Sequence, residues 1–502
     1  MSRDIQRGWL AVIERAGNRL PDPAIMFVIG TAVVIILAQL SVWLDWQIDS
    51  QAVHGSNQYI QANSVLSSEG IWWWLSTLVK NFIEFPPLGI VLVGMLGIGL
   101  AERCGLLPAL IVFAGRAIKQ AYLIPAIIFV GIMSSLALDA GYVVLPPIAA
   151  VLFMSMGYSP VLGIVAAFAG VSAGFGANLF ITSIDPLLAG FTESAAQLLD
   201  ADYQVAVTSN WWFMIASTVM LTLVGWWVTV YWVEPQTRKF EQGPECDSIS
   251  VPSLDSCQKQ ALLSAALVFL SLLCLVIMAA NIPGAPLYGQ GARFARWVEV
   301  TVPLLFILFI VPAVVYGWRA NTVTSGKQMA RHLADTLADL GPYIVLAFFA
   351  SQFIAVFKYT RLGEMLALSG GSWLSSLQID VTLLILGFVL LACLGNMLIG
   401  SMSAKYAFMA PVFVPMLMQA GVAPELTQVA YRIGDSVTNV ITPLNPYMVI
   451  ILAMLQKYQR QAGIGTLISL TLPYSMAFLA GWLMLLSLWV FMAWPLGPGH
   501  AF

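Results

Sequence analysis

Apolar residues dominate the chain, and they occur in two kinds of segment. In the regions 86–232 and 342–466, Gly, Pro and isolated charges divide the apolar sequence into pieces too short to cross a membrane as straight helices. The pattern therefore predicts an all-α polytopic membrane protein in which several helices are broken. Uninterrupted apolar runs of about 20 residues or more lie at 24–44, 260–281, 297–317 and 467–494.

Polar segments flank the first span and indicate its orientation. Lys and Arg are absent from the segment 45–69, which is typical of an external loop. A second basic stretch, 319–340, is amphipathic and is predicted to lie along the cytoplasmic interface. The N-terminus is predicted to be cytoplasmic because four arginines precede the first span: Arg3, Arg7, Arg15 and Arg19.

The two interrupted regions are copies of one another. Shifting the chain by 264 residues aligns 131–172 with 395–436 without a gap, and 13 of these 42 positions are identical. The register then resumes four residues out of step, with 181–186 on 441–446. Paired broken segments in two halves of a membrane protein are typical of secondary transporters, whose solute site lies at the breaks. We expect the copies to be inverted. Identical pairs include Gly131/Gly395, Tyr142/Tyr406, Gly157/Gly421, Pro160/Pro424 and Gly170/Gly434.

The second copy carries the most polar of these segments. Arg432, Asp435, Ser436 and Asn439 are spaced i, i+3, i+4 and i+7, so a helix places all four on one face. Gly434, Pro443 and Pro446 are predicted to break that helix within a few turns. Such a face is costly in hydrocarbon unless it lines a cavity that a solute occupies. The alternative is an Arg432–Asp435 pair on a solvated helix.

Oxygen-bearing side chains near the two breaks predict a cation site. With a carboxylate among them, they suit Na⁺, and a carboxylate in a partly dry site could instead carry a proton. The predicted cation-binding residues are Asn178, Asp185, Asn396, Asp435, Ser436 and Asn439. Asn445, the counterpart of Asp185, offers a further oxygen. Arg432 and Lys405 suit a carboxylate-bearing solute, although Lys405 could equally extend to a membrane interface.

Composition supports the membrane class and limits the chemistry. The 502 residues are 59% hydrophobic and only 9% charged, whereas a soluble domain carries about 25% charged residues. The three histidines, His54, His332 and His500, lie outside the apolar spans, which disfavours His-based catalysis and His-ligated metals. The five cysteines show no metal-binding spacing. We therefore expect a transporter, with an intramembrane enzyme or a channel as alternatives, and no nucleic-acid partner.

Several motifs resemble the AbgT family of p-aminobenzoyl-glutamate transporters, over essentially the whole chain. They are 14–23 (ERAGNRLPDP), 139–142 (DAGY), 177–186 (ANLFITSIDP), 403–405 (SAK) and 434–439 (GDSVTN). The resemblance implies a homodimer in the bacterial inner membrane, with about nine transmembrane helices and two re-entrant hairpins. It also implies coupling to a cation, and either import of p-aminobenzoyl-glutamate or export of sulfonamide antimetabolites.

The resemblance also assigns functional positions. They fall on Asp185, Asn396, Ser403, Tyr406, Pro424, Arg432, Asp435 and Pro443. Tyr406 departs from the tryptophan expected after Ser-Ala-Lys, which concerns aromatic stacking on the substrate. We assign Ser403, Lys405, Tyr406, Pro424, Arg432, Pro443 and Asn445 to the substrate, and expect no cofactor beyond Na⁺ or H⁺ as coupling ion.

These predictions divide the chain into five regions. They are a cytoplasmic interfacial helix (1–23), the first span with its external loop (24–85), a first transporter repeat with a re-entrant hairpin (86–232), a linker with two spans and the amphipathic interfacial helix (233–341), and a second repeat with a re-entrant hairpin (342–502). The predicted function is cation-coupled transport of p-aminobenzoyl-glutamate and related aromatic carboxylates. A Na⁺/dicarboxylate-type symporter of another small organic anion is the alternative.

Overall fold

Helices account for most of the structure, a computed structural model that describes residues 23–49, 59–116, 122–137, 140–238, 254–292 and 294–498. The predicted interfacial helix at 1–23 and Asp139 fall outside these residues, apart from Pro23. In the described part, seven helical segments are long and apolar enough to cross a membrane. They are α2 (Pro23–Trp43), α4 (Ser68–Ile83) together with α5 (Pro86–Arg103), α11 (Trp211–Val228), α13 (Ser256–Asn281), α15 (Thr301–Arg319), α17 (Gly341–Tyr359) and α23 (Ile464–Phe491).

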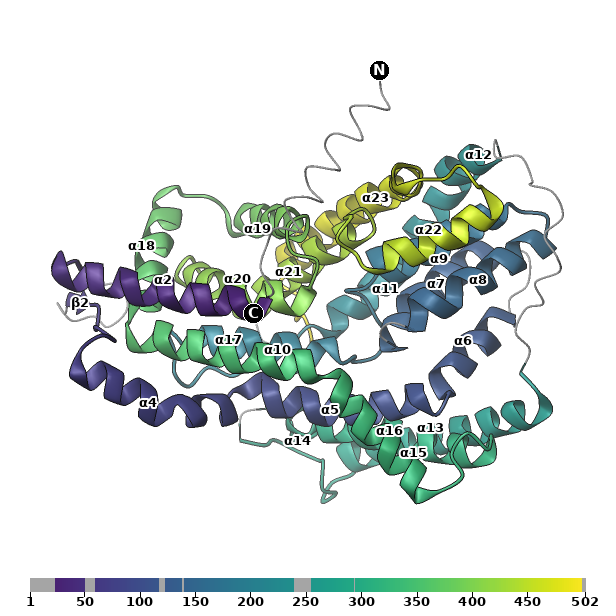
Figure 1. Cartoon of the computed structure of the whole chain (residues 1–502), viewed down its shortest axis with the longest axis horizontal. Coiled ribbons are helices and arrows are strands. Elements are labelled where there is room, and N and C mark those ends of the chain that lie inside the picture. Colours follow the sequence, from purple (N-terminus) through teal and green to yellow (C-terminus); the bar gives the residue numbers. More distant parts are fainter. Residues whose placement is uncertain are drawn as a thin grey trace.

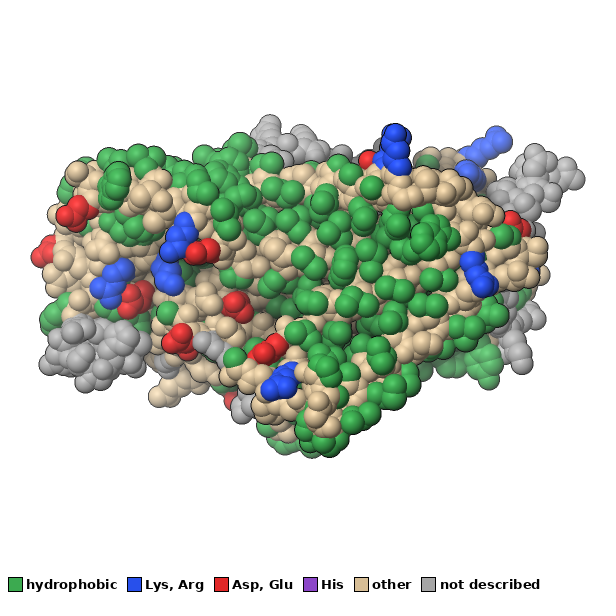
Figure 2. Space-filling model, turned by 90° about the horizontal axis from the view of Figure 1, so that it is seen from below, with side chains coloured by type: hydrophobic (Ala, Val, Ile, Leu, Met, Phe, Trp, Pro, Cys, Tyr) green, Lys and Arg blue, Asp and Glu red, His purple; other side chains and the backbone are tan. Residues whose placement is uncertain are grey.

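The outer surface is apolar where these helices face outward. Figure 2 shows a broad field of hydrophobic side chains on one face of the molecule. On α13, for example, Leu263, Leu267 and Leu270 are all more than half exposed. A soluble protein rarely exposes so large an apolar surface, whereas the hydrocarbon of a bilayer covers it at no cost. The all-α membrane class is therefore confirmed.

Shorter elements connect the spans. A two-stranded antiparallel sheet, β1 (Gln47–Asp49) and β2 (Tyr59–Gln61), lies in the predicted external loop. The amphipathic helix α16 (Gly326–Asp339) packs on α5, where Arg103 pairs with Asp339. The other short elements are α6 (Leu106–Arg116), η2 (Ser134–Ala137), η3 (Thr229–Val233), α12 (Glu234–Thr237), α14 (Arg296–Glu299) and α18 (Leu362–Ser376).

The two copies of the repeat have the same order of elements. Each begins with two short helices joined by a tight tip and continues with a helix that breaks and resumes. The pairs are α7 (Leu123–Met133) and α19 (Val381–Asn396), α8 (Ala140–Ser155) and α20 (Met402–Gln419), α9 (Pro160–Ala173) and α21 (Pro424–Asn439), and α10 (Ile184–Ala196) and α22 (Tyr447–Tyr458). We identify the short-helix pairs α7/α8 and α19/α20 as the two hairpins that the family resemblance implies.

Glycines shared by the two copies have the same structural roles. Gly157 and Gly421, in the turns before α9 and α21, have φ of +83° and +84°, a left-handed conformation that side chains with a Cβ avoid. At Gly170 and Gly434, an added Cβ would lie 2.7 Å and 2.5 Å from a backbone oxygen of α7 and α19 respectively. Glycine is therefore required where each broken helix packs closely on its hairpin.

The two breaks expose backbone carbonyls, and the last helix of each copy supplies donors to them. In the first copy, Trp211 Nε1 of α11 donates to the Leu179 carbonyl at 2.9 Å. In the second copy, Ser475 and Thr471 of α23 donate to the carbonyls of Val437 and Val440. Broken helices persist at membrane depth because protein groups satisfy the released backbone.

The copies pack reciprocally. Helix α10 of the first copy contacts α20 and α21 of the second, and α22 of the second contacts α8 and α9 of the first. Figure 1 shows this arrangement, with α9 beside α22 and α10 close to α20. The helices that follow the two breaks therefore exchange partners, which brings the two breaks together.

Candidate functional site

Helix α21 carries polar side chains into the protein interior. It begins at Pro424 and ends at Asn439, ahead of the break that contains Pro443. The prediction that Gly434 helps to break it is wrong, because the helix continues through Gly434, which instead allows close packing on α19. Residues 424–438 are all buried, including Arg432 and Asp435. Because buried polar groups must find partners, the contacts of this face define the site.

Arg432 joins the two copies through an ion pair. Its Nη1 lies 2.5 Å from Oδ1 of Asp185, at the start of α10 in the first copy. The second carboxylate oxygen of Asp185 accepts hydrogen bonds from Thr182, at 2.6 Å from the backbone N–H and 2.8 Å from the hydroxyl. The solvated Arg432–Asp435 pair, our alternative, is wrong, because both side chains are buried and Arg432 pairs with Asp185.

A second buried ion pair joins Lys405 to Asp435. The ammonium Nζ lies 2.5 Å from Asp435 Oδ1 and 2.5 Å from Asn396 Oδ1, and 5.6 Å from the centre of the Tyr431 ring. Lys405 is only 1% exposed, so it does not extend to a membrane interface. Two formal charges are thus neutralised inside the protein within one turn of the Arg432–Asp185 pair.

Asn396, at the tip of the second hairpin, organises this pair. Its amide nitrogen donates to the backbone carbonyl of Asp435 at 2.8 Å, to Thr438 Oγ1 at 2.9 Å and to Asn439 Oδ1 at 2.9 Å. Asn439 in turn donates to the other oxygen of Asp435, at 3.1 Å. The hairpin tip and the end of α21 therefore form one hydrogen-bonded unit around Lys405.

The remaining asparagines occupy two different places. Asn445 donates across the copies to Ser172 Oγ at 3.2 Å and, within its own break, to the Asn439 carbonyl at 2.9 Å. Asn178 instead donates to Ser135 Oγ at 2.9 Å, at the tip of the first hairpin. Asn445 thus joins the two copies, whereas Asn178 donates within the first copy.

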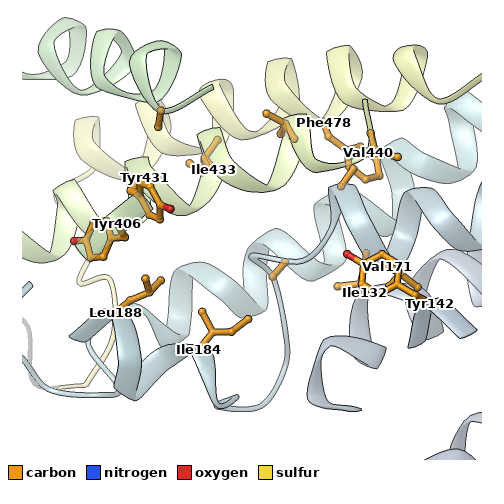
Figure 3. Packing of buried hydrophobic residues seen from close by; sticks show 14 of the residues in the cluster. Ile132, Tyr142, Val171, Ile184, Leu188, Tyr406, Tyr431, Ile433, Val440 and Phe478 are labelled. Atoms are coloured by element: carbon orange, nitrogen blue, oxygen red, sulfur yellow. The ribbon is translucent and has the colours of Figure 1, made fainter. Parts of the chain in front are cut away.

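Tyr406 is separated from the Lys405–Asp435 pair by the Tyr431 ring, and Pro424 lies at the far end of α21. Tyr406 is fully buried, and its hydroxyl lies 2.6 Å from Thr192 Oγ1, which donates to Gln428 Oε1 at 2.9 Å. Its ring packs against Tyr431 with centroids 4.3 Å apart (Figure 3). Pro424 starts α21, about 16 Å along the helix axis from Asp435.

Two buried polar atoms beside the ion pairs have no hydrogen-bond partner among the described residues. They are Ser436 Oγ and Arg432 Nε, on adjacent turns of α21. The break of the first copy lies against them, since a Cβ at Gly176 would approach Ser436 Oγ to 2.5 Å. An unpaired buried polar atom is costly, so this point favours a polar ligand or an alternative conformation.

The donor set does not fit Na⁺ at Asp435 and Asn396 while Lys405 is in place. Asp435 Oδ1 and Asn396 Oδ1 both contact Lys405 Nζ, and a second cation at these two oxygens would meet the ammonium at close range. Within the described ranges, no group of three or more His, Cys, Asp or Glu side chains could hold a metal. The Lys405 ammonium therefore occupies Asp435 and Asn396, two of the residues predicted to bind the coupling ion.

Sequence reasoning missed several residues that complete the site. Thr192 and Ser172 are partners of the predicted residues Tyr406 and Asn445, and Gln428 accepts a hydrogen bond from Thr192. Two of these residues could have been predicted from the sequence. Gln428 lies four residues before Arg432 and so shares its helical face, and Ser172 is the repeat counterpart of Ser436. Of the predicted residues, Ser403 is half-buried beside Ser401, and Pro443 is half-buried in the break.

Comparisons with known proteins extend over nearly the whole chain. A family model described as "AbgT putative transporter family" matches residues 8–502. The p-aminobenzoyl-glutamate transport protein of Escherichia coli (strain K12) is 32% identical over 495 residues, which is 98% of this chain and 96% of that protein.

Two solved structures superpose with a TM-score of 0.90 and 38% identity. One is the YdaH transporter of Alcanivorax borkumensis, whose topology is unusual; 95% of this chain and 100% of that chain are covered. The other is MtrF of Neisseria gonorrhoeae, whose structure illuminates a class of antimetabolite efflux pumps; 96% and 98% are covered.

Proposed function

The chain belongs to the AbgT family of membrane transporters, and on that premise we propose that it is a cation-coupled secondary transporter of p-aminobenzoyl-glutamate and related aromatic carboxylates. The E. coli relative supports the substrate, since it is a p-aminobenzoyl-glutamate transport protein. The two buried ion pairs at the meeting point of the breaks carry the proposal.

Arg432 is the proposed ligand of a substrate carboxylate. Asp185 Oδ1 holds its Nη1, and its Nε has no partner among the described side chains. A substrate carboxylate that replaces Asp185 gains a bidentate contact with the guanidinium, and the released Asp185 can then be neutralised by a cation. Substrate and cation binding are coupled in this way through one exchange of partners.

We propose that the Lys405–Asp435 pair keeps the hairpin tip electrically neutral while it moves. Asp435 and Lys405 neutralise each other inside the protein, and breaking a buried pair by removing one partner costs about 3–5 kcal/mol. Gradient-driven movement of the hairpin tip that carries Asn396 has to keep this pair neutral. Since Na⁺ does not fit beside Lys405, no step of the proposal depends on a sodium ion at Asp435.

Export of sulfonamide antimetabolites is the second candidate function. The likeness to MtrF, from a class of antimetabolite efflux pumps, favours it. The buried, hydrogen-bonded Tyr406 does not decide between the two, because its ring packs on Tyr431. We further propose a homodimer in the bacterial inner membrane with a cytoplasmic N-terminus.

Flux measurements in proteoliposomes test the proposal. Uptake of labelled p-aminobenzoyl-glutamate is measured under imposed Na⁺ and H⁺ gradients of each polarity, with a labelled sulfonamide in parallel. We expect saturable flux of the glutamate conjugate that one gradient drives and that Arg432→Ala abolishes. Flux that neither gradient affects, or that does not saturate, contradicts a coupled transporter and favours a channel.

A further inference from the structure

A third buried carboxylate, after Asp185 and Asp435, lies at the start of α21. Glu425, in the first turn of the helix, is 3% exposed. Ten residues separate it from Asp435, about 15 Å along the axis. The polar residues between them are spaced alternately by three and four, so they form one stripe: Glu425, Gln428, Arg432, Asp435 and Asn439.

Hydroxyl groups accompany this stripe at the Glu425 end. Gln428 accepts a hydrogen bond from Thr192, and Thr192 lies 2.6 Å from the Tyr406 hydroxyl. Glu425 Oε2 accepts a hydrogen bond from the Tyr203 hydroxyl at 3.0 Å. Hydroxyl groups both donate and accept, so they can pass a proton on or release it.

Tyr203 connects Glu425 to a loop that carries exposed residues. It lies in the loop between α10 and α11 and is half-buried, between the exposed residues Asp202 and Gln204. Burial, and then the negative charge of Glu425, raise the pKa of the Tyr203 phenol, so this hydroxyl stays a donor to the carboxylate. Because the surrounding loop is polar and exposed, it faces an aqueous phase.

Among the described residues, other titratable groups lie near Glu425 on several elements. Tyr406 approaches it from α20, and Asp200 lies beyond Tyr203 in the loop. Glu193 of α10 is engaged with the backbone N–H of Val205. Arg432 lies about two turns further along α21.

We propose that Glu425 is a proton-binding site, distinct from the Asp435–Lys405 pair, that exchanges protons with the aqueous phase beside Tyr203. On protonation, a hydronium ion in the loop gives a proton to the Tyr203 hydroxyl oxygen and becomes water, while the original hydroxyl proton of Tyr203 passes to Glu425 Oε2. Tyr203 then changes from donor to acceptor, and the reverse steps release the proton. The transport role of this site rests on the proposed function, whereas its protonation does not.

Infrared difference spectroscopy of the purified protein tests protonation without transport. We expect a pH-dependent band of a protonated carboxyl group in the wild type that Glu425→Gln removes. Tyr203→Phe should move the midpoint upward by about one to two pH units, because it removes a hydrogen bond that stabilises the charged carboxylate. Glu84→Gln, which changes an exposed carboxylate next to α4, is the control and should leave band and midpoint unchanged.

Flux measured over the same pH range gives the second readout. Wild-type flux should change by up to about tenfold per pH unit on one side of the midpoint, and Glu425→Gln flux should not. If the carboxyl band is unchanged in Glu425→Gln, the proposal is overturned. It is also overturned if the midpoint in Tyr203→Phe equals that of the wild type, and this second test can be made even if Glu425→Gln does not fold. If the band behaves as expected but the wild type transports nothing, the proposed function fails and the proton site stands.

Discussion

The two copies of the repeat place different side chains on matching backbones. In the second copy, four positions around the hairpin tip and α21 are polar or charged, and in the first copy their counterparts are apolar or glycine. The pairs are Asn396/Ile132, Lys405/Gly141, Arg432/Phe168 and Asp435/Val171. Figure 3 shows Ile132, Tyr142 and Val171 lying close together, at a distance from Tyr406 and Tyr431.

This difference separates what the fold needs from what the function needs. The first copy forms the hairpin and the broken helix with an apolar interior, so the charges of the second copy are not required to build that backbone. Replacing buried ion pairs by well-packed apolar groups is often neutral or stabilising. The charges are therefore best explained by transport. What the first copy adds is Asp185, which reaches across to Arg432.

Asp435→Asn should have the largest effect. It leaves the Lys405 ammonium buried without its charged partner, which should destabilise the protein by about 3–5 kcal/mol and abolish gradient-driven flux. Unfolding in detergent and flux in proteoliposomes measure the two effects. Val171→Ala, at the matching position of the first copy, should lower stability by about 2 kcal/mol and keep flux. Wild-type flux in folded Asp435→Asn contradicts the assignment.

Removal of both charges sharpens the same comparison. The double variant Lys405→Met/Asp435→Leu makes the second copy resemble the apolar first copy. It should recover most of the stability that Asp435→Asn loses, roughly 3 kcal/mol, because no buried charge is left unpaired. Flux should remain absent. If flux returned together with stability, the pair would have only a structural role.

Arg432→Lys should weaken binding of p-aminobenzoyl-glutamate by about 10- to 150-fold, since an ammonium cannot reproduce the two parallel hydrogen bonds of a guanidinium. The loss should be smaller for an uncharged sulfonamide, which has no carboxylate. Equilibrium binding to the purified protein measures both. Phe168→Leu, at the matching position of the first copy, should leave both affinities unchanged. Equal losses for the two solutes in Arg432→Lys would show that Arg432 only braces Asp185.

The smallest effects should be equal in the two copies. Gly157→Ala and Gly421→Ala each force a Cβ into a left-handed conformation, at a cost of about 1–2 kcal/mol, and neither Cβ has a neighbour within 4 Å. Both variants should keep flux and agree in stability within about 0.5 kcal/mol. Costs that differ by more than this would show that the two turns are not equivalent, against the repeat.

The backbone of the repeat was predictable because glycine and proline report local geometry. Gly157/Gly421 mark left-handed turns, and Pro160/Pro424 mark helix starts, so matching positions in the sequence carry matching structure. The order of hairpin and broken helix follows from the same residues. Sequence distance does not affect such signals.

Partner choice was not predictable, because it depends on which helices pack together. Arg432 and Asp435 are three residues apart and can pair on an isolated helix, yet Arg432 pairs with Asp185 and Asp435 with Lys405. The exchange of α10 and α22 between the copies brings these partners into contact. Nothing in the local pattern around Arg432 specifies a residue of the other copy.

The Arg432–Asp185 pair can form only late in synthesis of the chain. Its members are 247 residues apart, so at about 5–20 residues per second the ribosome needs roughly 12–50 s to deliver Arg432 after Asp185. During that time the first broken helix has to enter the bilayer, or wait beside it, with an unmatched carboxylate. The first half therefore cannot complete its buried ion pair alone, and its broken helix reaches its final contacts only after the second half has been synthesised.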